Sequence, residues 1–487
     1  MKIFRESIFI KKIKDSRNVM ILSMIMACIC VLITYPGIFY SDSYERVREA
    51  YEIKNLILNA LRGERVRTEM WLTITPSYFM AACLEITGNI AGYTICQVFF
   101  FFYASFLLIK KLSKNFRIIQ YIAFVINPLF YCVSVYYEAG IGCISSIVFL
   151  VLIVWERKTL DNVLDKIILV AGTIIFSFAA FGYRANAFTI LPVIFLIIFL
   201  WNKRKKLRII LVSSVILGLV FIAAVPKWLC VDTMSSASAS FVWEIVTTIQ
   251  NMDWKKQAEY IDYLDNIGGD GATAYAVQVS NKDNICNCLS GGINWATVSV
   301  GENPKEILKK YIKLALKEPL VFFKTKKDFV CSTLGISAPL GVWEWTYNWA
   351  DKMEEFGFSD TNQRHRFLDR YSNFMEQMEI LRMPWLMFLV SFILLVLEKR
   401  INRMRERKIG LQEGVFLIAV FYYGAFMINN QSMEFRYFYP SCYLLVIMDV
   451  SLFISIMEIL VKRYVKKKFL VDLNRLLLSK CDDSEMR

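Results

Sequence analysis

Two acidic residues stand at the ends of apolar segments, where a carboxylate can do chemistry beside a membrane. Asp42 follows the first apolar segment, and Glu138 lies between the third and the fourth. A carboxylate within hydrogen-bond reach of a hydroxyl can remove its proton as a general base. We predict that Asp42 is this base and that Glu138 orients an acceptor or ligates a cation.

Two arginines occupy similar positions. Arg184 and Asn186 follow the fifth apolar segment, and Glu434 and Arg436 precede the last one. A guanidinium group stays charged and matches phosphate oxygens bidentately, so it can stabilise a departing phosphate. We expect Arg184, Arg436 and Asn186 to bind a phosphate-bearing donor and Glu434 to contact the acceptor or a metal. The alternative is that each is a helix-end charge solvated by interfacial water.

A metal site built on cysteine or histidine is not expected. The chain has one histidine, His365, and its close cysteine pair outside the apolar segments, Cys286 and Cys288, is poorly spaced for zinc. Two acids from different loops can bind a divalent cation through oxygen. Mg²⁺ or Mn²⁺ is therefore a candidate cofactor, and its ligands stay open.

The elements that must position these residues are membrane spans. Of the 487 residues, 56% are hydrophobic, against about 45–50% in an ordinary soluble protein. The apolar residues gather in runs of about 17–25, the length that crosses a hydrocarbon core of about 30 Å. The predicted spans are 19–36, 90–109, 118–136, 139–155, 167–182, 187–201, 209–225, 384–398, 411–428 and 437–461.

Basic residues orient these spans, because cytoplasmic loops carry the excess of Lys and Arg. With a cytoplasmic N-terminus, the basic clusters all fall on one side; they are 2–17, 110–117, 203–208, 399–408 and 462–468. The short loops on the other side contain Arg184 and Arg436 as their only basic residues. The sequence thus predicts a multi-pass plasma-membrane protein with both termini cytoplasmic. Its net charge of +14 is spread over loops, which indicates lipid headgroups rather than nucleic acid as partner.

The expected fold is an all-α membrane protein of about ten transmembrane helices with a mainly helical soluble domain on the outer face. The expected parts are a bundle at 1–225 with a first outer loop at 37–88, an extracytoplasmic domain at 226–383, helices at 384–468 and a cytoplasmic tail at 469–487. The first outer loop is expected to contain an amphipathic helix with a charged face from residue 44, and a second helix at 71–87.

The extracytoplasmic domain contains two further signals. Residues 304–330 have the pattern of a basic amphipathic helix that Pro319 interrupts. Seven of the eleven tryptophans lie between 226 and 383. They either anchor the domain at the headgroup level or stack on a sugar face.

The order of these short motifs resembles a known superfamily. Tyr35-Pro-Gly37 with Ser41-Asp-Ser43 is similar to the opening of GT-C-type integral membrane glycosyltransferases, in their protein-mannosyltransferase-like and bacterial branches. Tyr183-Arg-Ala-Asn186 is similar to an Arg-x-Asn turn of these enzymes, and Glu434-Phe-Arg-Tyr-Phe-Tyr-Pro440 to their late Arg-Tyr-aromatic-Pro segment. The resemblance covers the first six spans and residues 409–460, and it leaves out 226–383.

The chain departs from this superfamily in two places. Tyr137 stands where related bacterial chains often carry a lysine before the second outer acid, which Glu138 resembles. Thr73-Ile-Thr-Pro-Ser77 stands where relatives commonly have a His-Pro pair. Any substrate contact of these two family residues is therefore absent or replaced.

The resemblance implies a transferase that moves a sugar from a polyprenyl phosphate to an extracytoplasmic glycan, lipid or protein. In that family the acid of the first outer loop is catalytic, which assigns the role to Asp42. A flippase or transporter is the alternative, and it would need polar residues at mid-membrane depth, whereas the ionisable residues here crowd the span ends. A polysaccharide polymerase, which would share the outer arginines, is the other alternative.

Overall fold

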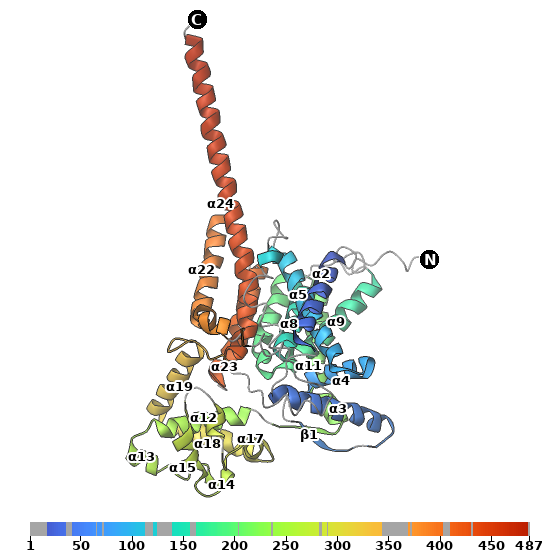
Figure 1. Cartoon of the computed structure of the whole chain (residues 1–487), viewed down its shortest axis with the longest axis vertical. Helices are drawn as coiled ribbons and strands as arrows, with labels where there is room; N and C mark the ends of the chain where they lie inside the picture. The colour runs from blue at the N-terminus through green and yellow to red at the C-terminus, as the bar shows by residue number, and fades with distance from the viewer. Residues whose placement is uncertain are drawn as a thin grey trace.

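The computed structural model describes residues 17–35, 41–64, 66–70, 73–112, 120–123, 139–155, 162–202, 204–234, 237–281, 285–289, 291–342, 369–370, 373–402, 410–429 and 432–485. These residues are overwhelmingly helical, in agreement with the predicted all-α class (Figure 1). Two three-residue strands, β1 (Thr68–Met70) and β2 (Val231–Thr233), pair in parallel.

The helices of the apolar part are α2 (Arg17–Thr34), α5 (Ile90–Leu112), α8 (Ala139–Trp155), α9 (Val163–Tyr183), η1 (Ala185–Ile190), α10 (Leu191–Trp201), α11 (Lys205–Trp228), α22 (Pro384–Asn402), α23 (Leu411–Ile428) and α24 (Phe435–Glu485). Five of the described helices, α5, α9, α11, α23 and α24, are long and apolar enough to cross a membrane. Three shorter apolar helices cover Arg17–Ile33, Gly140–Trp155 and Ala185–Trp201. Apart from 118–136, which lies mostly outside the described residues, each predicted span falls on a helix. The total of ten spans stays a prediction.

These helices run along one bundle and end at its two opposite ends (Figure 1). At one end the rings of Trp155 and Trp201 lie 4.0 Å apart and Lys399 pairs with Glu413. The described basic residues that flank the helices there are Lys110, Lys111, Arg204, Lys205, Lys399 and Arg400. We call this the basic end.

The opposite end, which we call the site end, contains the residues of the predicted chemistry. There Asn89 Nδ2 donates to Tyr35 Oη at 3.5 Å, and Trp385 N donates to Leu334 O at 3.0 Å. Arg184 follows α9 at this end. These six basic residues and the predicted site residues thus lie at opposite ends of one bundle.

Two helices of the first outer loop lie at the site end. They are α3 (Ser41–Leu61) and α4 (Thr75–Thr87), both of which the sequence predicts. Pro76 lies in the first turn of α4, and Gly88 ends it with φ of 68°, a left-handed conformation that glycine adopts without strain. β1 follows α3, and Arg67 forms an ion pair with Asp232 across its pairing with β2.

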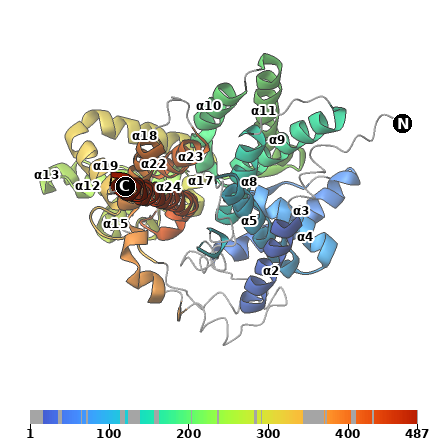
Figure 2. The same cartoon turned by 90° about the horizontal axis from the view of Figure 1, so that it is seen from above.

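Shorter helices continue the chain beyond the site end (Figures 1 and 2). They are α12 (Ala237–Gln250), α13 (Trp254–Ala258), α14 (Asp265–Gly268), α15 (Ala272–Val279), α16 (Ile285–Cys288), α17 (Trp295–Ser299), α18 (Asn303–Lys317), α19 (Pro319–Thr333) and η4 (Glu379–Arg382). The interruption of the 304–330 helix falls at Pro319, as the sequence predicts. Trp243 of α12 is fully buried and donates to Asn281 O at 2.9 Å, so this ring is neither a headgroup anchor nor a sugar platform.

Close packing at the site end depends on a glycine. A Cβ built on Gly142 of α8 would lie 2.0 Å from Cε1 of Tyr183, the last residue of α9. Only a residue without a side chain allows this ring to rest on α8. The contact fixes the end of α9, and therefore the position of Arg184 that follows it.

We expect Gly142→Ala to lower the thermal stability of the purified protein, because the added methyl group overpacks the Tyr183 ring at a cost of about 1–3 kcal/mol. The matched control is Gly424→Ala within α23, where a Cβ would meet nothing within 4 Å. Alanine favours a helix over glycine, so this control should be neutral or stabilising. Equal melting temperatures for the two variants would contradict the packing argument.

Candidate functional site

Arg184 and Arg436, which are far apart in the sequence, lie against the same aromatic ring. Cζ of Arg184 is 5.8 Å from the centroid of the Tyr437 ring, and Cζ of Arg436 is 4.9 Å from it. Nη2 of Arg436 also donates to Tyr437 Oη at 3.0 Å. A guanidinium group over a tyrosine face is attracted by the negative charge of the ring. Tyr437, which the sequence analysis did not single out, therefore brings the two predicted phosphate ligands together.

Glu434 supplies the negative charge beside them. Its Oε2 lies 2.7 Å from Nε of Arg436, and the two side chains are only 14% and 9% exposed. The structure thus places Arg184, Arg436 and Glu434 in one cluster. The sequence analysis predicts these residues in loops on the same side of the membrane. Among the side chains that the structure describes in this cluster, two are cationic and one is anionic.

The backbone around Glu434 is held by a segment that follows α19. Gly341 N donates to Met433 O at 2.8 Å, and Phe435 N donates to Gly341 O at 2.9 Å. Thr333 at the end of α19 donates to Met433 Sδ at 3.5 Å, and its carbonyl accepts from Tyr423 Oη. The cluster therefore depends on α19 and α23 for its position.

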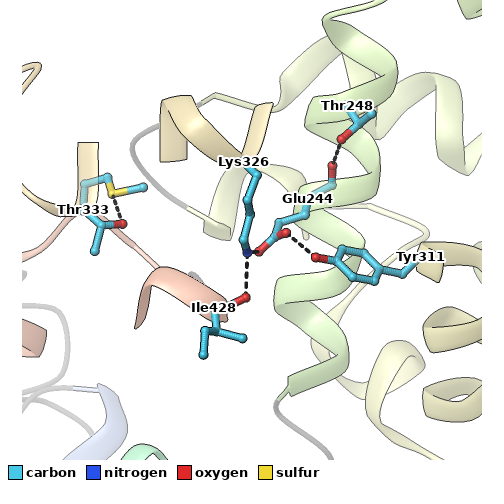
Figure 3. Close-up of polar contacts among 7 residues, drawn as sticks. Glu244, Thr248, Tyr311, Lys326, Thr333 and Ile428 are labelled. Carbon is cyan, nitrogen blue, oxygen red and sulfur yellow. Dashed lines mark hydrogen bonds and ion pairs between the residues drawn. The ribbon is translucent and has the colours of Figure 1, made fainter. Parts of the chain in front are cut away.

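A buried ion pair links the shorter helices to this support (Figure 3). Glu244 of α12 is 2% exposed in its side chain and pairs with Lys326 of α19 at 2.6 Å. Lys326 Nζ also donates to Ile428 O at the end of α23, at 2.6 Å. Tyr311 donates to the second carboxylate oxygen of Glu244 at 2.8 Å. Burial, and then the Glu244 carboxylate, raise the pKa of Tyr311, so its hydroxyl stays a donor.

Asn186 lies in η1, which packs along α23. Thr189 of η1 donates to Phe421 O at 2.6 Å, and the side chain of Asn186 contacts the Tyr422 hydroxyl. Asn186 Nδ2 is buried, and the Tyr422 hydroxyl is its polar neighbour among the described residues.

A second polar network joins α3 to the turn that contains Arg184. Arg46 is 4% exposed, and its Nη1 donates to Thr73 O at 2.8 Å. Thr73 Oγ1 in turn donates to Tyr183 O at 2.8 Å. The hydroxyl-rich 73–77 segment, where the resembled family has His-Pro, thus forms the link between α3 and α9.

Glu49 extends this network. It is 2% exposed and accepts from Ser77 Oγ at 2.7 Å. The sequence analysis assigned the charged residues of α3 to the polar face of an amphipathic helix, and this is wrong for Arg46 and Glu49, which are buried. The missed signal is their spacing: residues 42, 46 and 49 lie on one face of a helix.

Asp42 lies in the first turn of α3, by its backbone, on the face of Arg46 and Glu49. Its side chain is outside what the structure describes, and so is all of Glu138. In the described part of the chain, no group of three or more His, Cys, Asp or Glu residues could hold a metal ion. The predicted cation therefore has no ligand set among the described side chains.

A carboxyl group deeper in the bundle was also missed by the sequence analysis. Asp449 of α24 accepts from Ser391 Oγ of α22 at 2.7 Å through Oδ2. Its other oxygen, Oδ1, is buried without a hydrogen-bond partner among the described residues. At 1.5 Å per residue, Asp449 lies about 21 Å along α24 from Phe435. Placing an ionisable side chain at this depth of a membrane helix costs free energy, so such a residue indicates a functional role.

The arrangement at the site end can bind an anion. Two guanidinium groups face a shared ring, a buried amide donor lies in the adjoining η1, and one carboxylate neutralises part of the charge. Comparisons with protein-family models, with curated proteins and with solved structures found no match. The function must therefore be argued from these residues.

We expect Lys326→Met to destabilise the purified protein, because it leaves the buried Glu244 carboxylate without its cation. Breaking a buried pair on one side costs up to about 3–5 kcal/mol. The double variant Glu244→Gln/Lys326→Met should recover most of this loss, because the substituted amide is neutral and its oxygen can still accept from Tyr311. The measurement is thermal unfolding in detergent.

The matched control is Lys305→Met. Lys305 pairs with Glu302, and both side chains are exposed, at 73% and 82%. Exposed pairs contribute little, so this variant should melt like the parent chain. A double variant as unstable as Lys326→Met alone would contradict the role given to the ion pair.

Proposed function

We propose that this protein is a membrane glycosyltransferase of the GT-C type. It moves a sugar from a polyprenyl-phosphate carrier to an acceptor hydroxyl on the extracytoplasmic side. The single observation that carries the proposal is the position of Arg184 and Arg436 against Tyr437, with Glu434 beside them, at the end of the bundle opposite the Lys and Arg residues that end α5 and α22 and begin α11. By the positive-inside rule, the basic end is the cytoplasmic one.

The arginines have the chemistry that a phosphate leaving group requires. Negative charge grows on the phosphate oxygens as the sugar departs, and preorganised cations stabilise that charge most in a site from which water is excluded. Arg436 is 9% exposed in its side chain. It therefore meets the phosphate in surroundings of low dielectric constant, where the attraction is strong.

Asp42 acts as the general base in this proposal. It accepts the proton of the acceptor hydroxyl while the hydroxyl oxygen attacks the anomeric carbon of the sugar, and the bond to the phosphate breaks. The support is positional: Asp42 shares a helix face with Arg46, which is linked through Thr73 to Tyr183, the neighbour of Arg184. The hydrogen bonds from Arg46 to Thr73 and from Thr73 to Tyr183 thus connect the helix of the proposed base to the turn that contains Arg184.

A bilayer site suits a donor with a long apolar carrier. The helices α9, α23 and α24, which contribute to the cluster or contact it, are apolar enough to cross a membrane. A polyprenyl chain can stay in the hydrocarbon beside them while its phosphate reaches the site end. Glu138 and Glu434 are proposed to position the acceptor, and 226–383 to recognise it.

A transporter or lipid flippase is the second candidate, and one observation favours it. Asp449 is a carboxyl group inside α24 with one unpartnered oxygen among the described residues. Intramembrane carboxyls of this kind occur in transport pathways. Against this candidate, the other predicted site residues gather at one end of the bundle.

The test of the proposed function uses the full chain in nanodiscs with a panel of polyprenyl-phosphate sugars. A transferase releases free lipid phosphate, whereas a flippase leaves the donor chemically unchanged. We expect Asp42→Asn to slow donor turnover by about 10²–10⁴-fold, the usual contribution of a general base. Arg436→Lys should also slow it, because lysine loses bidentate binding.

Two matched controls accompany these variants. Glu45→Gln lies on the same helix but forms only an exposed pair with Arg48, so turnover should be unchanged. Asp449→Asn should leave turnover intact as well, whereas it should stop a transporter. Full activity in Asp42→Asn, or no release of lipid phosphate with any donor of the panel, would reject the transferase.

A further inference from the structure

The helices α18 and α19 expose apolar side chains next to lysines. In α18, Leu308, Ile312 and Leu316 are 41%, 50% and 78% exposed, at a spacing of four residues. In α19, Leu320 and Phe323 are 86% and 68% exposed. Water is a poor solvent for such a continuous apolar stripe, and stripes of this kind mark interaction sites.

The polar residues of this surface have a single sign of charge. Between 308 and 327, the exposed positions other than Pro319 and the five apolar residues are all lysines: Lys309, Lys313, Lys317, Lys324 and Lys327. The one acid of this stretch, Glu318, is less exposed and pairs with Lys256, and the next acid, Asp328, is also less exposed. We call these ten apolar and basic residues the basic apolar face.

The α18 part of this face is an open, nearly flat patch. Lys309, Ile312, Lys313, Leu316 and Lys317 line it along one side of the helix, and the surface they offer is mostly apolar. Such a surface fits a partner that offers negative headgroups above an apolar layer.

The position of α19 relates this face to the ends of the membrane helices. Lys326 donates to Ile428 O at the last residue of α23, and Leu334 O accepts from Trp385 N at the start of α22. At 1.5 Å per residue, Phe323 and Leu320 lie about 5 and 9 Å along α19 from Lys326. A headgroup layer is about 5–8 Å thick. If the end of α23 marks the edge of the hydrocarbon, Phe323 lies within the thickness of this layer and Leu320 lies close to its outer limit. Figure 1 shows α19 between the ends of α22 and α23 and the shorter helices.

We propose that the basic apolar face docks on the bilayer in which this same chain is embedded, with a leaflet of anionic phospholipids as its partner. Leu316, Leu320 and Phe323 enter the boundary between headgroups and acyl chains, while Lys309, Lys313 and Lys324 bind lipid phosphates. Amphipathic helices with lysines on one side and large apolar residues on the other bind membrane interfaces in this way. The docking does not depend on the proposed transferase activity.

The test is photo-cross-linking to lipid in nanodiscs that contain one copy of the full chain. The discs are phosphatidylcholine alone or with about 30% phosphatidylglycerol, enough to give an anionic surface, and a trace of each lipid has a diazirine on its acyl chain. Peptide mapping should find lipid adducts on residues 308–324 in the anionic discs. Lys309→Glu/Lys313→Glu/Lys324→Glu should reduce these adducts at least about tenfold, because three attractions become repulsions. Leu316→Ser/Leu320→Ser should reduce them independently of headgroup charge.

The matched control is Trp254→Ser/Lys255→Glu in α13. Trp254 is 74% exposed and lies beside Lys255. The pair therefore combines an exposed aromatic ring and a lysine, as the basic apolar face does, but on a different helix. This variant should leave the adducts on 308–324 unchanged. Adducts no more frequent on 308–324 than on α13, or equally frequent without phosphatidylglycerol, would overturn the proposal. A parallel set of nanodiscs contains two copies of the chain. If the substitutions changed the adducts only in that set, the face would be a contact between two copies, and the proposal would be overturned.

Discussion

Two like charges on one aromatic ring are the constraint on which the site end depends. Arg184 and Arg436 both lie against Tyr437, and they repel each other in surroundings where water screens little. The face of the ring and the carboxylate of Glu434 offset part of this repulsion. An anion bound by both guanidinium groups, as proposed for the lipid phosphate, would offset more of it.

The helices around this cluster can be understood as its support. Tyr183 holds the end of α9 in place because Gly142 lets its ring approach α8. Gly341 holds the Met433–Phe435 backbone through two hydrogen bonds. The buried pair of Glu244 and Lys326 then joins α12 to α19 and to the end of α23. The shorter helices beyond the bundle are thus mechanically continuous with the residues proposed to bind phosphate.

Apolar runs were sufficient to predict most of the apolar helices, because hydrocarbon thickness sets the length of such runs locally along a sequence. The orientation that the basic loops indicate stays a prediction. Tyr437 could not be selected in advance, since only tertiary packing decides which of several neighbouring rings the arginines share. The burial of Arg46 and Glu49 was missed because their acceptor and donor, Thr73 and Ser77, lie beyond α3 in the sequence. A buried charge is tolerated only where such partners are in place. They belong to the segment in which the chain departs from the family it resembles, so the likeness of the flanking motifs could not have revealed them.

The two ionisable regions of the bundle differ in how well their charges are compensated, and this difference bears on function. Arg184, Arg436 and Glu434 at the site end share a ring and an ion pair. Asp449 has one hydroxyl donor, Ser391, and an oxygen without a partner among the described residues. A carboxyl group repels a phosphate when it is ionised and attracts it little when it is neutral. The cluster at the site end, with its two guanidinium groups, is therefore better suited than Asp449 to the anionic lipid that we propose as donor.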